Sequence, residues 1–333
     1  MKILLQVITK FQILSQLNFM SSTSDINFCS SIENNVLGQR GCSTTPIALE
    51  KSIHNDTDFT IILGDVTNSL NFHTPLNELL FQFYTKQKLL FPVFGYSDII
   101  DKPASIYSVY FRYYQQNALF GSYAQTFRNT FERGGYYYFT KNKAIFVFLN
   151  IYYNQDEQQF WLNNLILSYQ NFHCHIFLSD YQKLEPLFKR YLINMQSHST
   201  VHTQYDHALK ISFKLPNIIY HSNFNIIDRE NYSYRVLTFN PKLVEFQQYA
   251  LNIQTTQISE EFTSLSLPQF STGFNQETIL SAIESIKVNQ ELFQQILSSQ
   301  TSSSDHGLLE YCSGFVISNE QLVECMQTGE INE

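Results

Sequence analysis

The sequence predicts an α/β fold. Short apolar runs, each ending at a small or acidic residue, recur through the first two thirds of the chain, and helical stretches lie between them. Such runs are typical of buried strands, and their alternation with helices indicates an α/β domain. The 333 residues are 44% hydrophobic and 15% charged, which indicates a globular chain that can bury a substantial core.

We expect four buried strands where an apolar run stops at a polar residue or a glycine. They are Phe59 to Leu63 before Gly64-Asp65, Leu89 to Phe94 before Gly95, Ala144 to Leu149 before Asn150, and Phe172 to Leu178 before Ser179-Asp180. In open α/β folds, ligand-handling side chains gather at the carboxyl ends of strands, because the loops there vary while the sheet holds their bases. The polar residues after these strands are therefore the first candidates for a site.

One helix is predicted between the third and fourth of these strands. Trp161, Leu165 and Tyr169 share a face of the stretch from Asp156 to Tyr169. The acidic pair at its start supports the helix N-terminus through the helix dipole. The Tyr136 to Tyr138 run is interpreted as a strand with packed rings rather than a lipid contact.

The C-terminal part has a different pattern. From about Glu260 the apolar residues follow a helical spacing, with Ile279, Ile283 and Ile286 in one stripe and a second helix after Asn289. We therefore expect residues 251–333 to form a C-terminal α-helical extension.

The first 19 residues form a weak candidate signal peptide. Their apolar residues are interrupted by Gln6, Lys10 and Gln16, which makes a poor hydrophobic region. No later run approaches the roughly 20 apolar residues that span a bilayer, so no transmembrane segment is expected. A net charge of -8 without a Lys/Arg block excludes a nucleic-acid backbone as partner.

The five cysteines show no zinc-binding spacing. Cys29 with Cys42, and Cys312 with Cys325, are close enough in sequence to bridge short loops, which leaves Cys174 inside a buried strand. Five reduced thiols remain the alternative. Asn55 and Asn231 begin Asn-x-Ser/Thr sequons, which would be glycosylated only in the secretory pathway.

Several segments resemble, in order, the acid sphingomyelinase-like branch of the metallophosphoesterases. They include SDINF at 24–28, GQRGCSTTP at 38–46, ILGDVTN at 62–68, FPVFGYSD at 91–98, EQQFWLNNL at 157–165, VHTQYD at 201–206 and YRVLTFNPK at 234–242. The resemblance implies a calcineurin-like phosphoesterase domain over residues 20–250, built as a two-sheet α/β sandwich flanked by helices. It also implies two metal ions at the strand ends and cleavage of a phosphodiester in a lipid or nucleotide.

Some of the metal ligands that the resemblance implies are kept. Asp25 matches the carboxylate of the family's Asp-x-His motif, and Asp65 matches a bridging aspartate. His202 matches one imidazole of a Gly-His-x-His motif, and Asp180 offers a carboxylate where the family has Gly-His. Asp25 and Asp65 could instead be helix caps or turn residues, and His202 a hydrogen-bonded loop histidine.

Other ligand positions are replaced. Asn27 stands for the histidine of Asp-x-His, Tyr96 for a metal-binding asparagine, and Gln204 for the last histidine. Ser97 stands at the position of the family's general acid, so no catalytic residue is assigned. An alternative register through His198 also lacks the second imidazole. His73 is a weaker candidate for a substrate contact.

These replacements favour a secreted or endolysosomal pseudo-phosphodiesterase that binds a phosphorylated headgroup, a phospholipid surface or a protein. The alternative is an active phosphodiesterase for sphingomyelin or a nucleotide phosphodiester, with zinc or another divalent metal in an altered centre. The first hypothesis needs no metal. A structural or adhesive glycoprotein is a third hypothesis, which leaves the ordered motifs unexplained.

Overall fold

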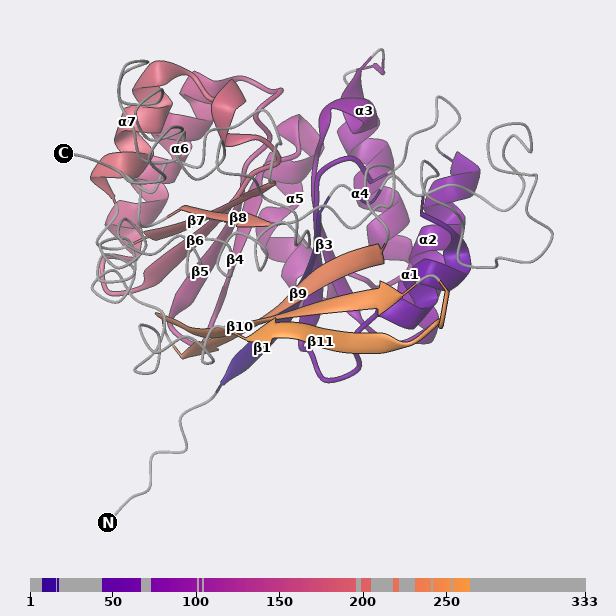
Figure 1. Ribbon diagram of the computed structural model, residues 1–333. Helices are drawn as coiled ribbons and strands as arrows, with labels where there is room; N and C mark the ends of the chain where they lie inside the picture. The colour runs from indigo at the N-terminus through magenta and orange to yellow at the C-terminus, as the bar shows by residue number, and fades with distance from the viewer. Residues whose placement is uncertain are drawn as a thin grey trace, which may run out of the picture.

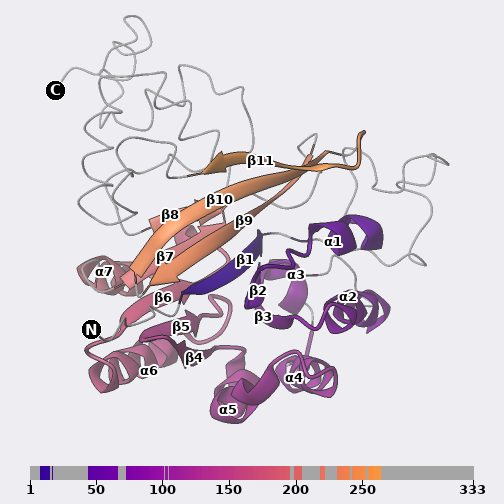
Figure 2. The same cartoon turned by 90° about the horizontal axis from the view of Figure 1, so that it is seen from below.

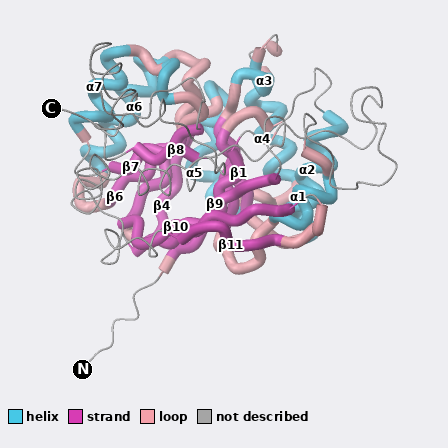
Figure 3. The backbone as a smooth tube through the Cα atoms, viewed as in Figure 1, coloured by secondary structure: helices cyan, strands magenta, loops and turns pink. Residues whose placement is uncertain are grey.

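The computed structural model describes residues 8–15, 17, 44–66, 73–100, 102–103, 105–195, 199–204, 218–221, 231–240, 242–252 and 254–263. These residues form two β-sheets that share one core, with helices around them (Figure 1). In Figure 3 helices lie above the strands and on both sides of them, while β10 and β11 lie at the lower edge. The predicted α/β fold, a two-sheet sandwich flanked by helices, is therefore confirmed.

The larger sheet has six strands in the order β11-β10-β9-β1-β2-β3 (Figure 2). β1, β2 and β3 are parallel to one another, while β9, β10 and β11 add an antiparallel half. The strands are β1 Thr9–Ser15, β2 Phe59–Leu63, β3 Leu89–Val93, β9 Asn231–Asn240, β10 Lys242–Asn252 and β11 Ile258–Thr263.

The smaller sheet has five strands in the order β4-β5-β6-β7-β8. β5 to β8 are parallel, and β4 is an antiparallel edge strand. The strands are β4 Tyr137–Lys141, β5 Ala144–Phe148, β6 His173–Phe177, β7 Ser199–Gln204 and β8 Ile218–His221. The strands predicted from the four apolar runs are β2, β3, β5 and β6.

Two of the helices begin at side-chain caps. Thr45 accepts a hydrogen bond from the Ala48 N–H at the start of the first helix, and Asn154 accepts one from the Glu157 N–H at the start of the predicted helix. The helices are α1 Pro46–Ser52, α2 His73–Thr85, α3 Tyr96–Ile99, α4 Ile106–Gln116, α5 Ala124–Gly134, α6 Gln155–Ser168 and α7 Pro186–Asn194, with 3-10 turns η1 Gly121–Tyr123 and η2 Tyr181–Lys183.

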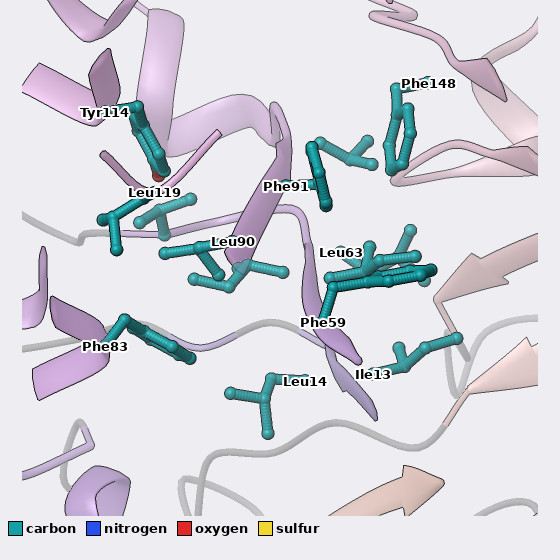
Figure 4. Close-up of a cluster of buried hydrophobic side chains, with 14 of the residues drawn as sticks. Ile13, Leu14, Phe59, Leu63, Phe83, Leu90, Phe91, Tyr114, Leu119 and Phe148 are labelled. Carbon is teal, nitrogen blue, oxygen red and sulfur yellow. The ribbon is translucent and has the colours of Figure 1, made fainter. Parts of the chain in front are cut away.

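The core between the sheets is largely aromatic. The Phe59 ring of β2 stacks on Phe11 of β1 at 5.2 Å and meets the edge of Phe146 of β5 at 5.3 Å. Phe91 of β3 and Phe148 of β5 lie 5.9 Å apart across the same space (Figure 4). Rings at these separations add attraction beyond their buried area, so this cluster fixes how the two sheets pack.

The outer face of the smaller sheet packs on helices. Alternate residues of β5 point to opposite sides, so Phe146 belongs to the core between the sheets while Val147 lies in a second cluster. That cluster contains Leu162 of α6 and Phe188 of α7. It also buries Cys174, whose thiol is free, and burial raises its pKa. The prediction that Cys174 lies in a buried strand is confirmed.

Part of the weak candidate signal peptide, residues 1–19, forms a strand of the larger sheet. β1 lies inside the larger sheet, parallel to β2 on one side and antiparallel to β9 on the other. Phe11, Ile13 and Leu14 are fully or almost fully buried. Cleavage after residue 19 would remove an internal strand.

The predicted boundary after residue 250 also needs correction. β10 continues to Asn252, and β11 pairs with it as far as Thr263, so the sheet includes residues expected in the helical extension. The predicted helices after Glu260 and the cysteines Cys29, Cys42, Cys312 and Cys325 lie outside the described residues. Within the described part of the chain, no helix is long and apolar enough to cross a membrane.

The two sequons lie at different places in the fold. Asn55 is exposed in the turn between α1 and β2, and Asn231 is the first residue of β9. Glycosylation and a secretory location stay predictions.

Candidate functional site

The carboxyl ends of strands from both sheets meet at Gly64, directly after β2. Its N–H donates to the Val93 carbonyl of β3 at 2.9 Å, and its φ of 75° lies in the left-handed region. A Cβ there would lie 2.1 Å from Gln204 Nε2 and 2.8 Å from Ser179 Cβ. Only glycine fits, because the ends of β6 and β7 approach so closely.

Asp65 lies at this junction with its carboxylate turned toward α3. Its Oδ1 accepts hydrogen bonds from the Ser97 N–H at 2.9 Å and the Ser97 hydroxyl at 2.8 Å. Its φ of 44° is uncommon for a residue with a side chain. A Cβ on Gly95 would lie 2.2 Å from Asp65 N, so the β2 and β3 ends are in direct backbone contact. Asp65 therefore holds the start of α3.

Asp98 is a second carboxylate at the same edge, and it is fully buried. It accepts hydrogen bonds from the Val66 N–H at 2.9 and 3.1 Å and from the Gly95 N–H at 2.9 Å. Burial, and then the neighbouring carboxylate of Asp65, raise the pKa of Asp98 to about 7. Through these hydrogen bonds, Asp98 connects the loop after β2 with the loop after β3.

Asp180 follows β6 and lies beside a cation that the sequence did not single out. The Lys183 ammonium is 3.7 Å from Asp180 Oδ2 and donates a hydrogen bond to the Tyr152 hydroxyl at 3.3 Å. It also lies 5.3 Å from the ring centroids of both Tyr96 and Tyr152. Partial burial lowers the pKa of Lys183, but Tyr152, Asp180 and Asp65 outweigh it and the net shift is upward.

Gln204 ends β7 and reaches across to the larger sheet. Its side-chain amide donates a hydrogen bond to the Leu63 carbonyl at the end of β2. At this position, where the resemblance implies an imidazole ligand, an amide links the two sheets.

His202 is not brought together with Asp65 and Asp180. It lies inside β7, fully buried, with its ring stacked on Phe177 at 4.5 Å. Its Nε2 is 2.9 Å from His175 Nδ1, so one imidazole donates to the other. Strand residues two positions apart point to the same side of the sheet. His202 therefore points, like Gln204, toward the larger sheet and lies in the core rather than in a loop. The structure therefore gives His202 a place in the core.

His175 makes the stability of the fold dependent on pH. Burial lowers its pKa well below the usual value, and His173 and His202 add to the shift. The folded state keeps it neutral, while the unfolded chain takes up a proton below about 6.5. The free energy of unfolding is expected to fall as pH drops below about 6.5, by up to about 1.4 kcal/mol per pH unit. Urea unfolding at several pH values measures this slope.

His175→Phe is the matched variant for this test, since a phenyl ring fits among Phe146, Phe177 and Phe239 and cannot titrate. Its slope below pH 6.5 should be shallower than that of the natural chain. An unchanged slope would show that other groups cause the acid sensitivity.

The first ligand motif was assigned to Asp25-Ile26-Asn27. β1 and β2 are parallel, with Ser15 opposite Leu63. Both strands therefore end at the same edge of the sheet, where Gly64-Asp65 follows β2. Asp25 and Asn27, proposed for this motif, lie outside the described residues, as does the side chain of His73.

A pocket of about 410 Å³ lies beside this junction. Tyr96 and Tyr152, the two rings at Lys183, form part of its wall. The described residues that line it comprise four tyrosines, four aliphatic residues and two cations, namely Tyr96, Tyr107, Tyr152, Tyr153, Ile99, Ile100, Pro103, Ile106, Lys102 and Arg133. This lining suits a small molecule with an apolar part and negative charge.

The described side chains do not fit a divalent metal centre. Among them, no group of three or more His, Cys, Asp or Glu residues is arranged to hold a metal ion. The Oδ1 of Asp65 already accepts two hydrogen bonds from Ser97, and Asp180 faces the Lys183 ammonium. Zinc needs three or four such donors around one point.

Comparison with solved structures finds similarity to a purple acid phosphatase from yellow lupin (Lupinus luteus) seeds. The two share 12% identity with a TM-score of 0.42, over 83% of this chain and 55% of the phosphatase. This chain thus spans about half the length of that protein. No protein-family model and no curated protein matches the sequence. Similarity at this level carries no information about the site.

Proposed function

We propose that the chain is a phosphoesterase-type scaffold, similar to the acid sphingomyelinase-like phosphodiesterases, that binds a phosphorylated small molecule or headgroup without hydrolysing it. The observation that carries the proposal is the bonding of Asp65. Both donors of Ser97, which stands at the general-acid position, engage its Oδ1. The carboxylate expected to bridge two metals instead holds a helix.

The neighbouring positions support the same conclusion. Two-metal hydrolysis needs a dense set of ligands that clamp the phosphate and activate water. Here Gln204 links the sheets, Asp98 binds backbone N–H groups, and Asp180 lies beside Lys183. A serine in place of a general acid would by itself lower the rate by about 10²- to 10⁴-fold.

The pocket beside the junction supports binding of an anion. Arg133 and Lys102 line it, and none of its described lining residues is acidic. Arg133 forms an ion pair with Glu157, its Nε 3.0 Å from Glu157 Oε1. The Lys102 ammonium donates hydrogen bonds to the backbone carbonyls of Ser97 and Asp98. Because both cations already have partners, we expect weak binding in which tyrosine rings contribute much of the contact.

Metal content and hydrolysis test the proposal together. The protein, dialysed against zinc, manganese and calcium in turn, should retain well under one equivalent of each metal. It should cleave bis-p-nitrophenyl phosphate no faster than the matching Asp65→Asn variant. Elemental mass spectrometry and absorbance at the nitrophenolate band provide the two measurements.

The opposite result would support the alternative function. About one or two bound metal ions per chain, with hydrolysis that Asp65→Asn removes, is what an active phosphodiesterase with an altered centre requires.

A further inference from the structure

We propose that the strand-end carboxylates Asp65 and Asp180, together with the rings of Tyr96 and Tyr152, form a site for an ammonium group rather than for a divalent metal, and that Lys183 is its resident cation. This inference rests on the proposed function, because it assumes that no metal occupies the same place.

The contacts of Lys183 match what an ammonium group binds. Its Nζ donates to the Tyr152 hydroxyl at 3.3 Å and lies 3.7 Å from Asp180 Oδ2. The rings of Tyr96 and Tyr152, 5.9 Å apart, each have their centroid 5.3 Å from this nitrogen. Aromatic faces attract ammonium groups at such distances. A hard divalent cation needs several oxygen ligands, which ring faces do not supply.

Charge balance at the junction also favours a built-in cation. The Lys183 ammonium lies 3.7 Å from Asp180 Oδ2, and Asp65, which follows a strand of the other sheet, contributes to the upward shift of the Lys183 pKa. Lys102, the other lysine near α3, directs its Nζ to the backbone carbonyls of Ser97 and Asp98. Lys183 therefore supplies positive charge where the resemblance implies a metal.

The backbone holds Lys183 at this place. It ends η2, three residues after Asp180, and its N–H donates to the Asp180 carbonyl at 3.3 Å. The Gln155 side chain of α6 donates to the Lys183 carbonyl at 3.2 Å. From the β6 end, the side chain reaches Tyr96 at the β3 end, so one lysine connects the two sheets at the site.

Chemical rescue tests this role. Lys183→Ala should lower the midpoint of thermal unfolding by about 1–3 °C, because a half-exposed ion pair is weak. Methylammonium chloride should recover at least half of that loss, while sodium chloride at equal ionic strength should not. Lys189→Ala is the matched control, because Lys189 lies over one tyrosine ring, Tyr181, at 5.8 Å. It should show no methylammonium effect.

Three results would overturn the inference. They are equal midpoints for Lys183→Ala and the natural chain, recovery by sodium as large as by methylammonium, and stronger stabilisation of Lys183→Ala by manganese than by methylammonium. Stoichiometric manganese binding by the natural chain in equilibrium dialysis would instead overturn the proposed function. The two failures are therefore distinguishable.

Discussion

A chain that lacks residues 1–19 is expected to have no cooperative unfolding transition. The loss removes β1, whose neighbours β2 and β9 would each be left with an unpaired edge inside the sheet. Burial of Phe11, Ile13 and Leu14 contributes about 1.5–3 kcal/mol each, against a total stability of about 5–15 kcal/mol for a typical domain. Far-UV circular dichroism during urea titration measures the transition.

A chain that starts at Ile8 is the matched control, because it loses N-terminal residues but keeps all of β1. A cooperative transition in the shorter chain, with a midpoint close to that of the control, would contradict the placement of β1 and favour the signal-peptide interpretation.

Phe59→Ala is expected to reduce the free energy of unfolding by about 3–5 kcal/mol. The ring is 1% exposed and touches rings from both sheets, including Phe11, Phe91 and Phe146. Truncation removes these contacts and leaves a cavity at the centre of the sandwich, which the surrounding strands cannot fill without shifting. Urea unfolding of purified variants measures the difference.

Phe160→Ala makes the same chemical change on the surface, since Phe160 is 71% exposed on α6. Its effect should stay within about 0.5 kcal/mol. Similar losses in the two variants would mean that the aromatic core does not hold the sheets together as described.

The sequence predicted four of the parallel strands, β2, β3, β5 and β6, but missed β1, which lies inside the larger sheet. β2, β3 and β5 consist almost entirely of apolar residues, and β6 ends in Ile176-Phe177 before Leu178, so their runs are easy to recognise. β1 contains Lys10 and Gln12, which interrupt the apolar pattern. Gln12 is nevertheless buried, because its amide donates to the Ser52 carbonyl and its oxygen accepts from the His54 N–H and the Thr60 hydroxyl. A buried polar residue satisfied in this way cannot be distinguished from a surface residue by sequence alone.

The sequence predicted only part of the candidate site. Asp65 and Asp180 are located by the ends of clear strands; in the structure Asp65 accepts hydrogen bonds from Ser97 and Asp180 lies beside Lys183. His202 was assigned from a short motif whose register nothing else fixed, and the strand places it in the core. Lys183 was missed because its role depends on rings from distant segments, which no local spacing reveals.

The position of β1 has a consequence for the order of events during synthesis. β1 is synthesised long before β9, yet Thr9 pairs with Phe239. At about 5–20 residues per second, the partner strand follows roughly 10–50 s later. Until then one edge of the strand that carries Phe11, Ile13 and Leu14 has no neighbour, and such unpaired edges promote aggregation. We therefore expect the nascent chain to depend on chaperones and the larger sheet to close only after most of the protein has been made.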